Sequence, residues 1–143
     1  MAGPLTTLMR GTVDGLLRSY AQVLFSRSRR VGLLLLATTL LVPSVGLCGL
    51  IAGVTALSTA AILDLPSASR LNGLFSYNAV LVGLGVGASA DIAPATLGLA
   101  AAGAVLAVVM SAALDRLLST RLSLPQLSVA FQLALWLTAA AAP

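Results

Sequence analysis

The stretch LNGLFSYNAVLVGLGVGASA, residues 71–90, decides how this chain can fold. It begins with polar residues that include Asn72, Ser76 and Asn78, and its purely apolar part, Ala79–Gly87, is only nine residues long. Nine helical residues cover roughly 14 Å, about half of a lipid bilayer. Irregular backbone is tolerated at membrane depth only where it is buried in protein or lines a wet cavity. Residues 71–90 are therefore predicted to form a re-entrant half-helix whose polar start belongs to a site.

The rest of the chain has the composition of a protein that lies in lipid. Apolar residues make up 59% and charged residues 8% of its 143 residues, whereas charged residues are roughly a quarter of an ordinary globular protein. The ionic residues are Arg and Asp alone, and they leave four long stretches without charge: 31–63, 71–90, 92–114 and 122–143. We therefore expect residues 1–143 to form a single membrane domain that is multi-pass in a cell membrane, inner or plasma.

Proline and turn residues divide these stretches into helices. Because Pro43 cannot continue a helical hydrogen-bond ladder, the first stretch is expected to form two helices, about Val31–Val42 and Ser44–Leu63. A polar turn is expected at 64–69, where Asp, Pro and Ser residues cluster. The later spans are predicted at Pro94–Leu114, ended by Asp115 and Arg116, and at Leu124–Ala142.

Two further patterns complete the predicted fold. Residues 1–25 are weakly amphipathic and are predicted to lie as a helix along the membrane interface. The pairs Gly49–Gly53 and Gly83–Gly87 have the four-residue spacing at which helix backbones approach each other closely. The expected fold is an all-α membrane protein with about five transmembrane helices and one re-entrant half-helix.

The inventory of side chains excludes most other classes of function. No ionisable residue lies well inside an apolar stretch, so a proton relay, a voltage sensor or an ion-coupled carrier has no group to use. The absence of His removes the usual base of hydrolytic enzymes, and the single Cys48 permits neither an intrachain disulfide nor a cysteine metal site. We expect no enzyme activity, no cofactor and no metal. A solute that crosses this protein should be neutral and should move passively.

The positive charge of the chain does not indicate a nucleic-acid partner. The formal net charge is +4 at pH 7, and its cluster of Arg27, Arg29 and Arg30 lies beside a hydrophobic stretch. Nucleic-acid binding calls for clustered basic residues with groove-reading or aromatic partners. We interpret the three arginines as an anchor at the membrane interface.

Three blocks in fixed order resemble the urea transporter family, the passive urea channels of bacteria and vertebrates. QVLF at 22–25, followed by GLL at 32–34, is similar to the family's Q-V-x-F…G-L-L opening. GLFSYNAVLVGL at 73–84 resembles the block G-L-x-G-[YF]-N-x-x-L-V-G-L and is the most specific of the three. LPQLSVAF at 124–131 resembles the motif L-P-x-x-T-x-P-F. This chain departs from the pattern at Ser76 for Gly, at Ser128 for Thr, at Ala130 for Pro and over 26–30.

The resemblance implies an architecture larger than this chain. Family members contain two homologous halves, inverted about the membrane plane, with the pore between them, and they assemble as trimers. This chain resembles one half of such an inverted-repeat channel. The resemblance therefore implies a second homologous half, or a second copy of the chain, as partner. The end at Ala139–Pro143, without a polar tail, favours a fragment over a natural half-size protein.

The resemblance also implies which residues bind the solute. Phe25 and Tyr77 match the aromatic walls of a narrow slot, with Leu81 beside them. Gln22 and Ser128 match side chains whose oxygens accept the N–H groups of urea. Asn78 and Phe131, from the second and third blocks, complete the expected substrate-binding set.

Several functions remain open on the sequence alone. The leading hypothesis is passive, channel-like transport of urea through the slot. The channel could instead carry another small neutral solute, such as ammonia or a short amide. A third hypothesis, from a different class, is a truncated or structural membrane subunit that does not conduct.

Overall fold

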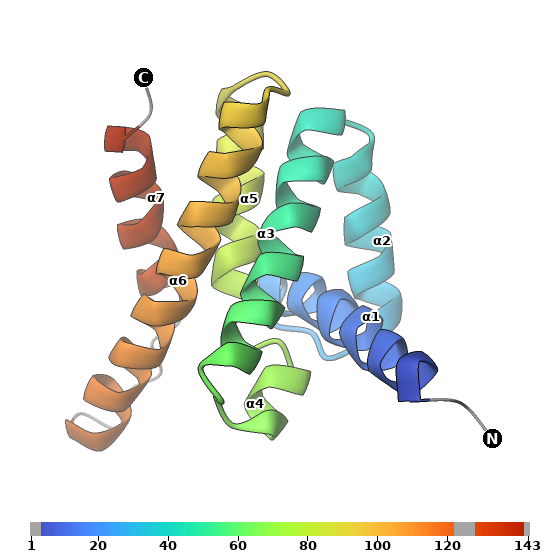
Figure 1. Cartoon of the computed structure of the whole chain (residues 1–143), viewed down its shortest axis with the longest axis vertical. Coiled ribbons are helices and arrows are strands. Elements are labelled where there is room, and N and C mark those ends of the chain that lie inside the picture. Colours follow the sequence, from blue (N-terminus) through green and yellow to red (C-terminus); the bar gives the residue numbers. More distant parts are fainter. Residues whose placement is uncertain (1–3, 122–127, 142–143) are drawn as a thin grey trace.

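The computed structural model describes residues 4–121 and 128–141, and within them the chain forms seven helices and no strand (Figure 1). The helices are α1 (Pro4–Val23), α2 (Arg29–Leu40), α3 (Pro43–Ile62), α4 (Ser67–Leu71), α5 (Tyr77–Ser89), α6 (Pro94–Arg121) and α7 (Val129–Ala141). The all-α prediction is confirmed for these residues.

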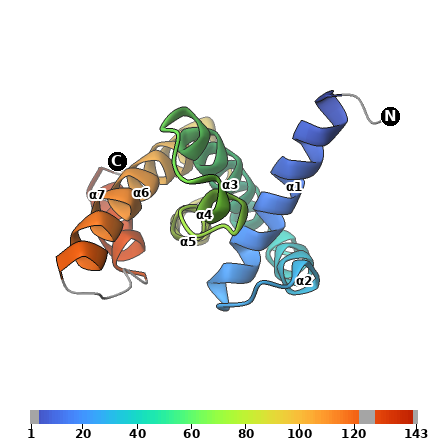
Figure 2. The ribbon, with the colours of Figure 1, turned by 90° about the horizontal axis from the view of Figure 1, so that it is seen from below.

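The helices are arranged around α3, α5 and α6, which all pack against one another. Viewed along the bundle, α1 and α2 lie on one side of α3 and α5, and α6 and α7 lie on the other side (Figure 2). The short α4 lies at the end of α3, and the loops joining α2 to α3 and α5 to α6 lie at the opposite end of the bundle (Figure 1). The start of α5 therefore lies inside the bundle, between these two sides.

The helix boundaries follow the proline and turn signals in part. The break at Pro43 is confirmed, since α2 ends at Leu40 and Pro43 is the first residue of α3. The helix that contains the expected span Pro94–Leu114 does not end at Asp115 and Arg116, because α6 continues through both residues to Arg121, and the end of the membrane span itself stays a prediction. Both side chains are exposed on the helix surface, and neither residue type interrupts helical backbone hydrogen bonds.

Two other expected boundaries are the turn at 64–69 and the start of the last span at Leu124. The predicted polar turn at 64–69 is partly wrong, because Ser67–Leu71 forms the short helix α4 directly after Pro66. The last span was expected from Leu124, but residues 122–127 lie outside the described residues, and the described helix begins at Val129.

The helices differ in whether they are long enough to cross a membrane. Among the described residues, two helices are long and apolar enough to cross a bilayer, Pro43–Ile62 and Pro94–Leu118. The apolar helices α5 and α7 have 13 residues each, and helices of this length cover about 20 Å. The short α5 agrees with the expected half-helix, whereas the number of spans and the re-entrant path stay predictions.

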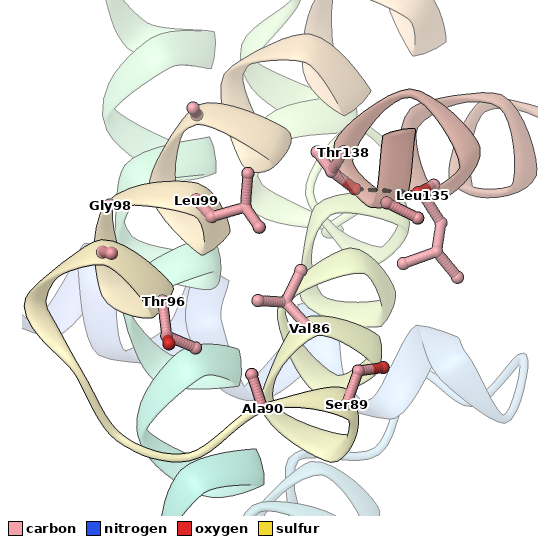
Figure 3. A pocket seen from close by; sticks show the side chains of 11 residues that line it. Val86, Ser89, Ala90, Thr96, Gly98, Leu99, Leu135 and Thr138 are labelled. Atoms are coloured by element: carbon pink, nitrogen blue, oxygen red, sulfur yellow. Dashed lines mark hydrogen bonds between the residues drawn. The ribbon is translucent and has the colours of Figure 1, made fainter. Parts of the chain in front are cut away.

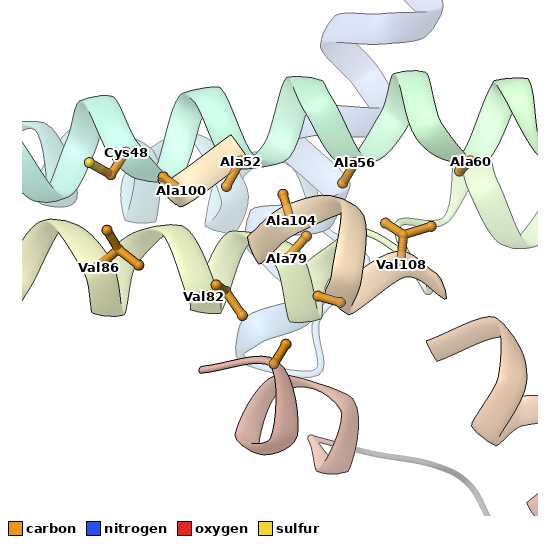
Figure 4. Close-up of a cluster of buried hydrophobic side chains, with 12 residues drawn as sticks. Cys48, Ala52, Ala56, Ala60, Ala79, Val82, Val86, Ala100, Ala104 and Val108 are labelled. Atoms are coloured by element: carbon orange, nitrogen blue, oxygen red, sulfur yellow. The ribbon is translucent and has the colours of Figure 1, made fainter. Parts of the chain in front are cut away.

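The core between α3, α5 and α6 is built from small side chains (Figure 4). A Cβ added at Gly83 would lie 2.5 Å from the carbonyl oxygen of Cys48 and 2.5 Å from the Cβ of Ala52. A Cβ at Gly87 would collide with the carbonyl oxygen of Ser44. The predicted close backbone approach at Gly83–Gly87 is therefore confirmed.

The glycine pair on α3 meets side chains instead of backbone. A Cβ at Gly49 would lie 2.6 Å from Leu84 Cδ2 and 2.6 Å from the hydroxyl oxygen of Tyr20. A Cβ at Gly53 would lie 2.5 Å from Leu16 Cδ1. Gly49 and Gly53 thus make room for α1 and α5 against α3, and they hold α1 beside the start of α5.

Candidate functional site

The turn that precedes α5 is docked on α1 through Gly73. Gly73 has a φ of +73° and closes α4: its N–H donates to Arg70 O (3.1 Å), and that of Leu74 donates to Ser69 O (3.1 Å). A Cβ at Gly73 would lie 2.7 Å from the backbone nitrogen of Ser19. Only glycine therefore fits this close contact between the turn and α1.

A buried pair of serines joins the same two segments. The hydroxyl oxygens of Ser19 and Ser76 are 2.6 Å apart, and both side chains are buried. The Ser19 hydroxyl also donates to Gly15 O at 2.7 Å. Because a hydroxyl has only one proton, Ser76 is the donor between the two serines. The departure from the family pattern at Ser76 is thus satisfied by a hydrogen bond to α1.

Two polar side chains of α1, Arg18 and Gln22, both bond to Asn72 at the start of the turn. Arg18 Nη1 donates to Asn72 Oδ1 at 3.0 Å, and Gln22 Nε2 donates to the backbone oxygen of Asn72 at 3.2 Å. With Nε2 engaged, Gln22 Oε1 is the group that could accept a hydrogen bond from a solute. Arg18 and Gln22 lie four residues apart and share one face of α1.

Phe25 has an unusual backbone directly after α1. Its φ is 54°, the left-handed conformation that glycine usually supplies at a helix end. The N–H of Phe25 donates to Gln22 O (2.9 Å), and that of Ser26 donates to Ala21 O (3.0 Å). The Phe25 side chain is 70% exposed. The end of α1 therefore projects the aromatic ring of Phe25 from the surface, three residues after Gln22.

The candidates on α5 point in different directions. Tyr77 is buried and Leu81 is half-buried. Asn78 is fully buried, and its Nδ2 donates to Ser111 Oγ on α6 at 3.2 Å. An amide that links two helices within the core stabilises their packing. Asn78 thus has a structural contact with α6, whereas Tyr77 is the first residue of α5.

The two candidates from the third block lie on the far side of α5. Ser128 is half-buried directly before α7, and its carbonyl oxygen accepts the N–H of Gln132 at 3.1 Å. Phe131 packs against the small-residue core. Helix α7 contacts α5 and α6, and Figure 2 shows it across α5 from α1. One chain therefore brings Gln22 to the start of α5 but does not gather all seven candidates on one side.

Comparison with known families agrees with the three sequence blocks. The model of the family described as "Urea transporter" matches residues 13–143, which include Gln22, the turn, α5 and α7. The chain belongs to the urea transporter family. No curated protein sequence matches it. Urea transporters form a family of channels and transporters and not of enzymes, so membership supports a membrane protein that takes part in urea transport.

This urea transporter family chain also has a pocket that the sequence did not predict. A cavity of about 550 Å³ lies at the end of the bundle between α5, α6 and α7 (Figure 3). None of the seven candidates lines it. The hydroxyls of Ser89, Thr96 and Thr138 in its wall already donate to backbone oxygens at 2.8–3.0 Å. The pocket therefore presents mainly apolar surface, and its three hydroxyls have no free proton to donate to a ligand, only lone pairs to accept with.

Sequence reasoning missed Arg18 and Ser19, which tie the turn to α1 in this family member, and it named Asn72 only as part of the polar start of residues 71–90. Both residues belong to the segment 1–25, which the sequence predicts only as a weakly amphipathic helix. The available signal was the four-residue spacing of Arg18 and Gln22. That spacing predicts a shared face but does not tell which segment covers it.

Proposed function

We propose that the chain forms one half of a passive urea channel in the inner or plasma membrane. The observation that carries this proposal is the family match over residues 13–143, which spans every candidate residue from Gln22 to Phe131. The docked turn supports it, because the most specific block of the sequence lies where α5 begins inside the bundle. In this proposal residues 1–143 act as a single multi-pass domain.

The candidate residues have the chemistry that a neutral, planar solute requires. Urea has four N–H donors, and each hydrogen bond to water lost on entry must be replaced. Gln22 Oε1 and the Ser128 hydroxyl would accept N–H groups, and the rings of Phe25 and Tyr77, with Leu81, would enclose the flat faces. Asn78 and Phe131 would hold this wall against α6 and the core. A hydrated cation would find too few strong ligands here to replace its water.

A second half is needed to close this slot. Phe25 is 70% exposed at the end of α1, whereas Ser128 lies across α5, next to α7. A single chain thus offers separate parts of a wall and not two facing walls. We propose that a second homologous half, or a second copy in the opposite orientation, supplies the facing side, as in transporters built from inverted repeats.

Urea flux into liposomes tests conduction directly. The purified chain is reconstituted, and shrinking and reswelling under a urea gradient are followed by stopped-flow light scattering. We expect urea entry faster than in empty vesicles and unaffected by a pH gradient or a membrane potential. A rate equal to that of empty vesicles would contradict conduction by this chain.

Two further measurements separate the remaining hypotheses. Competition by thiourea or acetamide distinguishes a urea slot from a channel for another neutral solute, since only a urea slot should favour urea among the three. The mass of the detergent-solubilised complex distinguishes a homo-oligomer from a monomer. A monomer that does not conduct would favour a structural subunit.

A further inference from the structure

Arg18 is a charged side chain that contacts the turn at the start of α5. The residue is half-buried, and its Nη1 donates to Asn72 Oδ1 at 3.0 Å. The backbone oxygen of the same Asn72 accepts Gln22 Nε2 at 3.2 Å. One residue therefore links a fixed positive charge to the amide that we propose as a urea acceptor.

The charge of Arg18 is not neutralised by a carboxylate in the described part of the chain. Asp14, one turn away on α1, forms its ion pair with Arg29 at 2.8 Å. Within the described residues Arg18 makes a hydrogen bond to a neutral amide and no ion pair. An amide satisfies one guanidinium N–H but leaves the net charge in place.

The same place receives a second positive contribution from the backbone. The N-terminus of α5, at Tyr77, follows the docked turn, and the aligned peptide dipoles of a helix give its start a partial positive charge. The Arg18 side chain and this helix start lie on opposite ends of the turn 72–76. Because Arg18 is half-buried, its charge is screened less than that of a fully exposed side chain.

We propose that Arg18 is a selectivity residue that excludes cations from the path beside Gln22. The fixed charge, held in position by Asn72, repels a cation of the size of urea, whereas neutral urea experiences no net repulsion. This inference rests on the proposed function, because it takes Gln22 as part of the solute path. It adds a specificity determinant that acts through charge and not through pore width.

The alternative is that Arg18 only fastens the turn to α1. In that case its removal lowers stability and urea flux but admits no cation. The two roles are separated by the ratio of methylammonium permeability to urea permeability, because methylammonium is small and carries one positive charge. A purely structural role would not raise this ratio.

The experiment compares four variants with the wild-type chain in proteoliposomes, and measures methylammonium entry and urea entry on the same preparation. Arg18→Gln removes the charge, and Arg18→Lys keeps it. Asn72→Asp keeps the shape of the side chain but places a carboxylate against the guanidinium. Arg116→Gln removes a charge from exposed α6 and controls for net charge. Folding is checked by size-exclusion chromatography and circular dichroism.

We expect the permeability ratio to rise by about tenfold or more in Arg18→Gln and in Asn72→Asp, since fixed charges change local ion concentrations by such factors. Arg18→Lys and Arg116→Gln should keep the wild-type ratio. An unchanged ratio in folded Arg18→Gln would overturn the inference, as would an equal rise in Arg116→Gln. If Arg18→Gln does not fold, the permeability ratio of the near-isosteric Asn72→Asp tests the inference instead. An unchanged ratio in folded Asn72→Asp would then overturn it.

The failure of this inference is distinguishable from the failure of the proposed function. Urea flux in the wild-type chain and an unchanged ratio in the variants would leave the urea channel and remove the role of Arg18. No urea flux in the wild-type chain would remove the urea channel. In that case a methylammonium leak that appears only in Arg18→Gln and Asn72→Asp would still support a cation barrier at Arg18.

Discussion

The N-terminal end of α5 is polar and tied to α1, whereas its C-terminal end opens onto an apolar pocket between α6 and α7. At the first end, Ser76 and the turn before it make hydrogen bonds to Ser19, Arg18 and Gln22. At the other end, the Ser89 hydroxyl donates to the carbonyl oxygen of Gly85 in its own helix. The comparison teaches that one short helix can be fixed by packing along its length while its two ends differ in chemistry, one tied to α1 by side-chain hydrogen bonds and the other facing a mainly apolar pocket.

The largest effect is expected from a variant that disrupts the packing of α5 against α3, on which both ends of α5 depend. Gly83→Leu would force a side chain into the backbone of α3 at Cys48. We expect a loss of about 3 kcal/mol of folding free energy or more, because an overpacked core with backbone contacts cannot relax. Gly98→Leu on α6 is the control, since nothing lies within 4 Å of its Cβ position. Unfolding in detergent, followed by circular dichroism, should distinguish the two variants, and equal stability would refute the close approach of α3 and α5.

The next effect concerns the turn alone. Gly73→Ala should destabilise the protein by about 1–2 kcal/mol from the left-handed backbone, with a further contribution from the contact with Ser19. Asp64 has the same role at the end of α3, with a φ of 48°, and it is exposed. Asp64→Gly should therefore stabilise by up to about 1 kcal/mol. Opposite shifts in melting temperature are expected, and shifts of the same sign would contradict this account of the turn.

A smaller effect tests the serine pair that joins the turn to α1. Ser76→Ala should cost about 1 kcal/mol, because it removes a buried hydrogen bond. Ser19→Ala should cost more than Ser76→Ala, since it removes the bond to Gly15 O as well. In the double variant the two losses should not add, since both variants remove the same bond. Additive losses in a double-mutant cycle would show that the two serines do not interact.

Much of the fold could be predicted because its signals are local. The ring of Pro43 prevents one continuous helix and suits the first position of the next one. Gly83 and Gly87 have no side chain, so their spacing predicts close packing against another helix. The end of α6 could not be predicted in this way. Asp115 and Arg116 predict where a span leaves the lipid. They do not predict where the helix ends, because a helix continues wherever its backbone hydrogen bonds are satisfied.

The candidate site was predictable only in part, for a similar reason. The resemblance selected Gln22 and the block around Tyr77, and the structure places the turn before α5 beside Gln22. The contact of Arg18 with Asn72 joins residues 54 positions apart, so no local pattern encodes it. The pocket near Ser89 arises where three helices diverge and likewise has no sequence signal.

The two ends of α5 can be compared directly in their effect on urea flux. In stopped-flow measurements on reconstituted protein, Gln22→Leu removes the proposed acceptor at the N-terminal end, and Ser89→Ala removes a hydroxyl at the pocket end. We expect Gln22→Leu to slow urea entry about tenfold, because a lost hydrogen bond to the solute raises the barrier by roughly 1–2 kcal/mol. Ser89→Ala should leave the rate of the wild-type chain unchanged. Equal rates in the two variants, or slowing by Ser89→Ala alone, would contradict the assignment of the solute path to the start of α5.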